Sequence, residues 1–363
     1  MHIVVAPDSF KGSADASEVA AAISRGWLSV APADRTTLAP MADGGEGTLD
    51  AFEASVPGAV RRRVTVTGPV GAPVDASWLL LPDGTAVVEL ASTSGITLLG
   101  PDGLQAQDAG TRGFGEAIAS ALAAGATRLL LAVGSSSSTD GGAGALQALG
   151  ARILDADGHD IGPGSRGLAQ VASVDLTGLA PLPERGAIVV SDVSNPLLGT
   201  TGAAAVFGPQ KGATAADVTT MDAALARFAA LLPVDPSTPG AGAAGGTAFG
   251  LLCWGATLEP GAAVIAETTG LRRAIATADV VITGEGRFDS QSAAGKAPTF
   301  VLGLAREAGA RRMLVAGSIE TDTEGFTAAV SLVDLAGSVE RAVADPIPWL
   351  ERAGARLAEA ARG

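Results

Sequence analysis

Short apolar runs followed by loops rich in glycine and acidic residues recur along the chain. Residues 3–5 and 280–282 are unbroken β-branched runs, Ile-Val-Val and Val-Val-Ile. Continuous runs of this kind are typical of parallel strands that are buried on both faces. Each run is followed by a loop and then by residues with a helical apolar period, so the pattern predicts β–loop–α units.

The first 57 residues contain two such units. The predicted elements are a strand at 3–6, a helix at 15–29, a strand at 36–39 and a helix at 48–55. Asp15 and Glu18 have the spacing of a capping box, which marks the start of the first helix. Val19, Ile23 and Trp27 form the apolar stripe of that helix.

From residue 61 the pattern changes. Apolar and polar residues alternate, and glycine and proline separate the runs, which is typical of antiparallel hairpins. The strands predicted from here lie at 63–67, 76–81, 85–90, 128–133 and 187–190. Helices are predicted at 112–124 and 215–231, and a third helix follows residue 142 and ends at residue 149. Residues 233–246, rich in Pro, Gly and Ala, are expected to be a flexible connection or a ligand loop. From about residue 271 the β–α pattern returns, with strands at 279–282, 313–316 and 329–333.

We therefore predict an α/β protein of two domains. Residues 1–60 and 268–363 are expected to form a parallel-sheet domain, which is interrupted by an inserted mixed α/β domain of residues 61–267. A chain of 363 residues with 47% apolar residues is sufficient for two hydrophobic cores. Open α/β sheets bind ligands beyond the carboxyl ends of their strands, so we expect the active site in a cleft between the domains.

Charge and composition exclude several classes of protein. A net charge of −14 argues against nucleic-acid binding, because phosphates need a basic surface. No run of 18 apolar residues occurs, so no membrane span is expected. A single cysteine, Cys253, excludes an internal disulfide and fits a reducing compartment. Met1 leads directly into the first strand without a signal-like segment, and we expect a cytoplasmic enzyme.

Many of the loops combine an acidic side chain with glycine. Seven such acids follow predicted strands or open predicted helices: Asp8, Asp43, Glu46, Asp140, Asp192, Glu285 and Asp289. Each one alone is equally well explained as a helix cap. As a group they suit Mg²⁺, which prefers oxygen ligands and usually takes only one or two carboxylates. The group therefore leaves one acid as a candidate general base.

All three lysines of the chain, Lys11, Lys211 and Lys296, lie in or beside these loops. Lysine is a compact point charge that suits a phosphate or a carboxylate. The alternative is that they are ordinary solvated loop lysines. Residues 135–139, Ser-Ser-Ser-Ser-Thr, lie between a predicted buried strand and a helix start, where a loop can bind an anion or be a simple polar turn.

Familiar motifs do not account for these loops. A P-loop requires Ser or Thr after its lysine, but Lys296 is followed by Ala297. Glycines 240, 242 and 245 match the spacing of a dinucleotide fingerprint but lack the strand that must precede it. His159 lies in a turn and is expected at the surface. With two histidines and no tyrosine, a Ser-His-Asp or histidine–zinc mechanism has little basis.

Six segments carry a resemblance to a known family. They are residues 6–12 (APDSFKG), 40–48 (PMADGGEGT), 140–144 (DGGAG), 195–199 (NPLLG), 208–212 (GPQKG) and 282–286 (ITGEG). In this order, and nearly from end to end, they resemble the bacterial type I glycerate kinase family. The resemblance implies a Rossmann/flavodoxin-like domain interrupted by a second α/β domain.

The resemblance also implies an activity. Members of the family phosphorylate D-glycerate with ATP and Mg²⁺, mostly to 2-phosphoglycerate, with 3-phosphoglycerate reported for the wider activity. The expected partners are therefore the small molecules D-glycerate and ATP, with neither nucleic acid nor membrane, and a homodimer is left open.

Residue roles follow from the matched motifs. The expected catalytic residues are Asp8, Lys11, Asp43 and Lys211, where the lysines neutralise the glycerate carboxylate and the transferring phosphoryl group and Asp43 or Asp8 accepts the hydroxyl proton. The residues expected to bind substrate or phosphate are Ser9, Gly44, Gly45, Glu46, Ser136, Asp140, Gly141, Asn195, Gly284, Gly286 and Lys296. The expected metal ligands are Asp192 with Glu285 or Asp289.

Two departures from the family pattern leave alternatives open. Residues 134–142, GSSSSTDGG, stand where the family usually has GGSATNDGG, and residues 110–112, Gly-Thr-Arg, replace Gly-Thr-Gly. The enzyme alternatives are a kinase that forms 3-phosphoglycerate and a kinase for another small hydroxy acid. The non-enzyme alternative is a ligand-binding regulator, and a nicotinamide dehydrogenase ranks below it.

Overall fold

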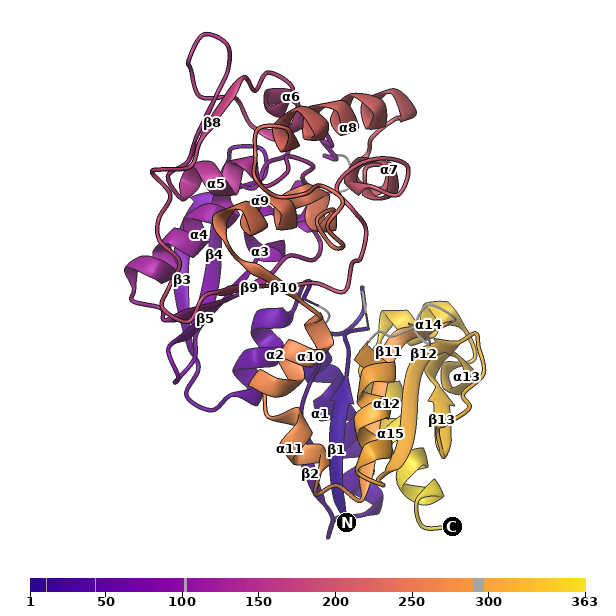
Figure 1. Ribbon diagram of the computed structural model, residues 1–363. Helices are drawn as coiled ribbons and strands as arrows, with labels where there is room; N and C mark the ends of the chain where they lie inside the picture. Colours follow the sequence, from indigo (N-terminus) through magenta and orange to yellow (C-terminus); the bar gives the residue numbers. More distant parts are fainter. Residues whose placement is uncertain (11, 43, 101–102, 290–296) are drawn as a thin grey trace. The chain divides into compact units, whose positions relative to one another are not determined.

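The computed structural model describes residues 1–363 except 11, 43, 101–102 and 290–296 (Figure 1). Contacts along the chain divide it into two compact units. Unit 1 comprises Met1–Asp43, Asp50–Pro57 and Ala262–Gly363, and unit 2 comprises Gly44–Leu49 and Gly58–Gly261. Lys11, Asp43 and Lys296, three of the residues expected in the site, lie outside the described residues.

Unit 1 is built on a five-stranded parallel sheet with the order β13-β12-β11-β1-β2. Its strands are β1 (His2–Pro7), β2 (Arg35–Leu38), β11 (Val280–Phe288), β12 (Arg311–Ile319) and β13 (Ala328–Ser331). Counted within the unit, this is the 2-1-3-4-5 order of flavodoxin-like sheets. The strand order reverses between β1 and β11, and this switch point is where such sheets bind ligands.

The central strands of this sheet are apolar because helices cover both of its faces (Figure 1). Ile3 and Val280 share a core with α1 (Ala16–Val30) and α15 (Pro346–Ala360). On the other face, α12 (Ala297–Glu307) packs on β11, β12 and β1. Asp15 and Glu18 form the predicted capping box at the start of α1. The unbroken β-branched runs of the sequence are thus explained by burial on both sides.

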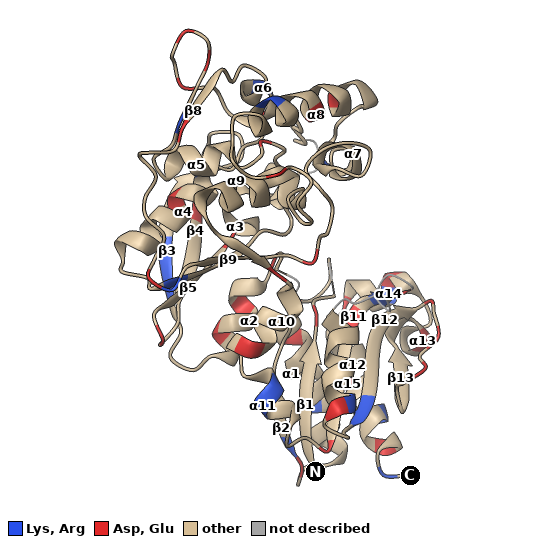
Figure 2. Cartoon of the chain, in the orientation of Figure 1, with Lys and Arg blue, Asp and Glu red and all other residues tan. Residues whose placement is uncertain are grey.

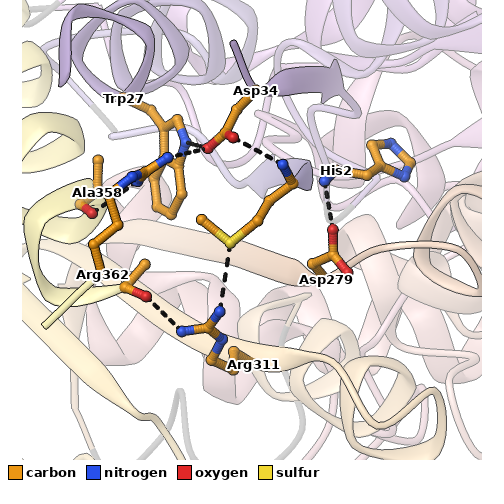
Figure 3. A network of polar contacts seen from close by, with 9 residues as sticks. His2, Trp27, Asp34, Asp279, Arg311, Ala358 and Arg362 are labelled. Atoms are coloured by element: carbon orange, nitrogen blue, oxygen red, sulfur yellow. Dashed lines mark hydrogen bonds and ion pairs between the residues drawn. The ribbon is translucent and has the colours of Figure 1, made fainter. Parts of the chain in front are cut away.

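A buried carboxylate joins distant parts of unit 1 (Figure 3). Asp34 accepts hydrogen bonds from the ammonium group of Met1 at 2.8 Å, from Trp27 Nε1 at 2.9 Å and from Arg362 Nη2 at 2.5 Å. Burial raises the pKa of Asp34, but these hydrogen bonds outweigh burial and lower the pKa to about 2. The contacts connect Met1, α1 and the residues after α15.

The remaining elements of this region are short helices. They are α2 (Thr48–Ser55), α10 (Gly261–Thr268), α11 (Leu271–Ile275), α13 (Leu332–Ala336) and α14 (Val339–Ala344). Ser331 ends β13 and caps α13 by accepting a hydrogen bond from Asp334 N at 3.2 Å. The strand predicted to reach residue 333 therefore stops two residues earlier.

Unit 2 contains a mixed six-stranded sheet with the order β10-β9-β6-β5-β4-β3. Its strands are β3 (Val60–Thr67), β4 (Pro73–Leu80), β5 (Thr85–Glu89), β6 (Arg128–Ala132), β9 (Ala187–Val190) and β10 (Thr257–Glu259). The pairs β3–β4 and β4–β5 are antiparallel, which confirms the predicted hairpins, and the other pairs are parallel. The mixed α/β class with parallel sheets is therefore confirmed.

Helices and one small sheet complete unit 2. The helices are α3 (Ala91–Ser94), α4 (Arg112–Ala123), α5 (Ala143–Ala148), α6 (Gly164–Leu168), α7 (Ala203–Phe207), α8 (Ala215–Ala229) and α9 (Thr247–Trp254), with 3₁₀ helices η1 (Ile96–Leu99), η2 (Pro209–Lys211) and η3 (Ala243–Gly246). Strands β7 (Arg152–Leu154) and β8 (Ser173–Asp175) form a separate antiparallel pair. No helix in the described part of the chain is long and apolar enough to cross a membrane.

The structure corrects one prediction about the central strand. The loop expected to begin at Thr283 is part of β11, which continues to Phe288 and stays paired with β12. Gly284 is needed because a Cβ atom there would lie 2.1 Å from the backbone oxygen of Val315. This glycine therefore accommodates the neighbouring strand, and its position alone does not indicate an anion site.

The segment 233–246 also differs from the sequence prediction. Most of its second half is buried, and Gly242 N donates a hydrogen bond of 2.9 Å to Asn195 O. A Cβ atom at Gly242 would lie 2.2 Å from the backbone oxygen of Pro196. The segment is therefore a packed part of unit 2 and not a flexible connection.

We predict that Gly284→Ala lowers the free energy of unfolding by about 2 kcal/mol or more, because the new Cβ collides with the backbone of a central strand. The matched control is Gly303→Ala in α12, where a Cβ meets nothing within 4 Å. The control should be neutral or stabilising by up to about 1 kcal/mol. Urea unfolding of the three proteins measures both effects, and equal stabilities of the two variants would contradict the packing described here.

Candidate active site

Several of the predicted loops meet in unit 2 around residues 134–142, here called the serine loop. Gly134 N, directly after β6, donates a hydrogen bond of 2.8 Å to Gly44 O. At the far end of the loop, Gly141 N donates to Gly245 O at 3.1 Å. A Cβ atom at Gly134 would lie 2.4 Å from the Cα atom of Gly45, so the two glycine segments lie in direct contact.

The glycine series at 240, 242 and 245 belongs to the same assembly. A Cβ atom at Gly245 would lie 2.0 Å from Ser138 O, which requires glycine at this contact. Asn195, which accepts from Gly242 N, also donates from Nδ2 to Thr201 O at 2.8 Å. These glycines therefore fit loops against one another, and the dinucleotide-fingerprint alternative finds no support in their packing.

Lys211 reaches the serine loop from η2. Its side chain is buried, with 2% of its surface exposed, and Nζ donates to Ser136 Oγ at 2.8 Å and to Ser138 O. Burial lowers the pKa of Lys211 to about 7, and the negative charge of Asp140 opposes this shift. For Lys211 the solvated-lysine alternative is therefore wrong.

Asp140 is held by four hydrogen bonds from neighbouring residues. Its Oδ2 accepts from Thr111 N at 2.9 Å, Thr111 Oγ1 at 2.8 Å and Gly144 N at 3.2 Å, and its Oδ1 accepts from Gly142 N at 3.0 Å. The residue is 1% exposed. Asp140 therefore fixes the shape of the serine loop and supplies a negative charge near Lys211. Sequence reasoning missed Thr111, although the departure from the family pattern at residues 110–112 marked this segment.

Three buried hydroxyl groups in or beside the serine loop have no hydrogen-bond partner within the described part of the chain. They belong to Ser94, Ser138 and Thr139. Ser94 contacts the serine loop directly, because its backbone oxygen accepts from Ser137 N at 3.2 Å and from Ser137 Oγ at 2.7 Å. A buried polar group without a partner costs about 1–3 kcal/mol, so such groups are often kept for binding. Together with the Lys211 ammonium group, they are suited to an anion.

The other acids expected in unit 2 lie nearer to solvent. Asp192 is exposed, and its Oδ1 accepts a hydrogen bond of 2.7 Å from Gly261 N at the start of α10. Glu46 is also exposed. His159 has 80% of its side chain exposed, which confirms its predicted surface position.

Unit 1 contains a cavity of about 340 Å³ at the switch point of its sheet, here called the unit-1 cavity. Five residues expected in the site line it: Asp8, Ser9, Glu285, Gly286 and Asp289. Asp8 N donates to Gly284 O at 2.7 Å, and Ser9 N donates to Asp8 Oδ1 at 2.6 Å. The first of these bonds continues the pairing of β1 with β11 by one residue.

The carboxylates of the unit-1 cavity have the chemistry of Mg²⁺ ligands. Asp8 and Glu285 are 9% and 8% exposed, so their charges are largely shielded from water. Arg287 contacts Asp289 at 3.4 Å and Glu320 at 2.8 Å, so positive charge is also present beside these acids. A hard divalent cation prefers carboxylate and phosphate oxygens as ligands. The residues therefore fit a magnesium-bound phosphate.

The position of the basic residues, and of Lys211 in particular, matters for the charge of the serine loop assembly. Figure 2 shows basic residues on β3 and α11 and acidic residues on α2. The three arginines of β3, residues 61–63, lie on the edge strand of the unit 2 sheet and are not part of the serine loop assembly. Among the described residues of that assembly, Lys211 is the basic side chain that hydrogen-bonds to the serine loop.

We predict that burial of Lys211 makes stability depend on pH. The pKa of Lys211 is about 7 in the folded protein, whereas the ordinary value of 10.5 applies to the unfolded chain. Between pH 7 and pH 10.5 the unfolded chain therefore binds a proton that the folded protein lacks. The free energy of unfolding should therefore be lowest below pH 7 and rise toward pH 10.5. From pH 6 to pH 9, wild type should gain about 2–3 kcal/mol relative to Lys211→Met.

Urea unfolding of both proteins at the two pH values measures this gain. Loss of the hydrogen bonds to Ser136 and Ser138 is common to both pH values, so it cancels in the comparison. A stability difference between the two proteins that is the same at pH 6 and pH 9 would show that Lys211 keeps its ordinary pKa.

Comparison with known proteins gives one consistent result. The model of the glycerate kinase family matches residues 3–362. The chain is 43% identical to a protein of Bacillus subtilis named glycerate kinase, with 99% of this chain and 97% of the relative covered. It is 41% identical to the Escherichia coli protein named glycerate 2-kinase, with 94% and 93% covered.

A solved structure agrees. The crystal structure of a candidate glycerate kinase 2 from Salmonella typhimurium LT2 superposes with a TM-score of 0.86 at 38% identity, over 100% of this chain and 98% of that one. The match of sequence and fold extends over all the segments that form the two candidate sites. The chain therefore belongs to the glycerate kinase family and is a kinase of that family.

Proposed function

We propose that this kinase transfers the γ-phosphoryl group of ATP to the 2-hydroxyl of D-glycerate, giving 2-phospho-D-glycerate and ADP. The observation that carries the proposal is the buried Lys211 ammonium group beside the hydroxyls of Ser138 and Thr139, which have no hydrogen-bond partner among the described residues. This arrangement suits a small organic acid, because a carboxylate can accept hydrogen bonds from all of them. The names of the Bacillus subtilis and Escherichia coli relatives support the same substrate and, in the second case, the 2-position.

Phosphoryl transfer requires mainly positioning and charge neutralisation from the protein. The glycerate hydroxyl oxygen attacks the γ-phosphorus, the bond to the β–γ bridging oxygen breaks, and ADP leaves with that electron pair. The hydroxyl proton passes to a carboxylate, and the proposed acceptor is Asp8 or Asp43. Holding the two reactants in line can supply about 7–11 kcal/mol of the barrier.

Charge neutralisation is assigned to two groups of residues. Lys211 and Lys11 are proposed to neutralise the glycerate carboxylate and the transferring phosphoryl group. Glu285 or Asp289, with Asp192, is the proposed ligand set of Mg²⁺, which when bound neutralises charge on the β- and γ-phosphates. Ser9, Ser136, Asn195 and the glycines of the loops position the substrates.

The product identifies the function directly. Phosphorus NMR of the reaction of D-glycerate with ATP and Mg²⁺ should show 2-phosphoglycerate as the main product. A 3-phosphoglycerate signal in its place would refute the proposed position and favour the 3-phosphoglycerate-forming alternative. ADP release with glycerate, lactate, tartronate and glycerol separates a glycerate kinase from kinases of other small hydroxy compounds. A binding regulator would release no ADP with any of them.

Lys211→Met is predicted to reduce kcat by about 10²–10³-fold, which is the usual loss when a charge-stabilising donor is removed from a site. The coupled ADP assay at saturating substrates measures it, and thermal unfolding establishes that the fold is retained. Arg166→Met is the matched control, because this basic residue pairs with Asp108 at the surface. The control should keep wild-type turnover. Wild-type turnover by Lys211→Met would remove this residue from the mechanism.

A further inference from the structure

The lining of the unit-1 cavity combines charged and apolar residues. One part carries the carboxylates described above, on the segments after β1 and along β11. Another part of the lining is apolar and is formed by Leu332, Val333, Val339, Ala342 and Val343 of α13 and α14. A ligand that fills the cavity must therefore combine polar groups with an apolar surface.

Val339 and Val343 are unusually exposed for their type. They are 56% and 51% exposed, the highest values among large apolar side chains in the part of the chain that the structure describes. Their i,i+4 spacing puts them on one face of α14, and both line the cavity. Exposed apolar residues in isolation need no explanation, but two adjacent ones at a cavity mark a binding surface.

This apolar part of the lining is anchored in the unit 1 core. Leu332 and Ala342, beside the two valines, are 1% and 5% exposed and belong to the core that α1 and α15 share with the sheet. Binding sites formed by residues that are held in place by packing lose little free energy to ordering. The cavity volume of about 340 Å³ lies in the range of small-molecule sites.

The two substrates of the proposed reaction differ in how they fit this cavity. Glycerate is small and anionic and has no apolar face for the valines. A nucleoside has a flat, largely apolar base for Val339 and Val343 and ribose hydroxyls that can donate to carboxylates. The switch point of a flavodoxin-like sheet is also the usual place for a nucleotide-type ligand.

We propose that the unit-1 cavity binds the nucleoside part of ATP, with the base against Val339 and Val343 and the phosphates toward Asp8 and Glu285. This assigns the nucleotide to unit 1, and it leaves the Lys211 assembly of unit 2 for the organic acid. The assignment rests on the proposed function for the identity of the nucleotide.

The test replaces the apolar surface with a neutral polar one, so that the charge of the cavity is unchanged. In the double variant Val339→Asn/Val343→Asn, the Kd for adenosine without Mg²⁺, measured by calorimetry, should rise at least tenfold. The KM for ATP should rise at least tenfold as well, while the KM for glycerate stays within twofold. Val30→Asn is the matched control, because Val30 is a 37% exposed valine of α1 that does not line the cavity.

Three outcomes would overturn the assignment: an unchanged adenosine Kd in the double variant, an equal rise of both KM values, or no adenosine binding by wild type at millimolar concentration. Thermal unfolding shows whether the double variant is folded, and Val343→Ser alone serves if it is not. The outcome is separable from that of the proposed function. If glycerate is no substrate but adenosine binding still depends on the valines, the cavity assignment stands alone.

Discussion

The placement of a lysine charge inside the protein is the constraint on which the candidate site depends. A buried ammonium group costs free energy unless hydrogen bonds and a counter-charge compensate. Ser136 and Ser138 supply the hydrogen bonds to Lys211, and Asp140 supplies the opposite charge. Asp140 in turn is held by Thr111 and by the start of α5, so the position of one charge fixes several segments at once.

Burial of Lys211 also explains why glycine is needed at several positions of unit 2. Segments from five parts of the chain must approach the serine loop closely enough to exclude water from Lys211. Gly134 and Gly245 allow backbone-to-backbone contacts that a side chain would block. In unit 1 the governing constraint is different, because the strand order reverses beside β1 and leaves an opening at the carboxyl edge of the sheet.

Local signals predicted local structure well. The capping box of Asp15 and Glu18, the apolar runs of β1 and β11 and the alternation of β3 to β5 all specify their elements through neighbours in sequence. Gly284 was misinterpreted because a glycine after an apolar run usually marks a strand end. Its actual partner is the backbone of Val315, 31 residues away, and no sequence pattern near Gly284 reports that contact.

The sequence indicated which residues belong to the candidate site better than it indicated how they are arranged. The placement of all three lysines beside glycine loops pointed to Lys211, but only the fold shows that its side chain is buried. The bond between Asp140 and Thr111 joins residues 29 positions apart and has no local signal. The apolar part of the unit-1 cavity was missed for a related reason, since Val339 and Val343 match an ordinary helix pattern until the cavity beside them is known.

The most direct test of this account is the titration of the lysine side chains by NMR of protein labelled with ¹³C at lysine Cε. The chain has three lysines, so the spectrum is simple, and Lys211→Met identifies one resonance. The account predicts that the Lys211 resonance titrates with a pKa of about 7 and that D-glycerate raises this pKa, because a bound anion favours the charged form. A Lys211 resonance that titrates near 10.5 and does not respond to glycerate would contradict it.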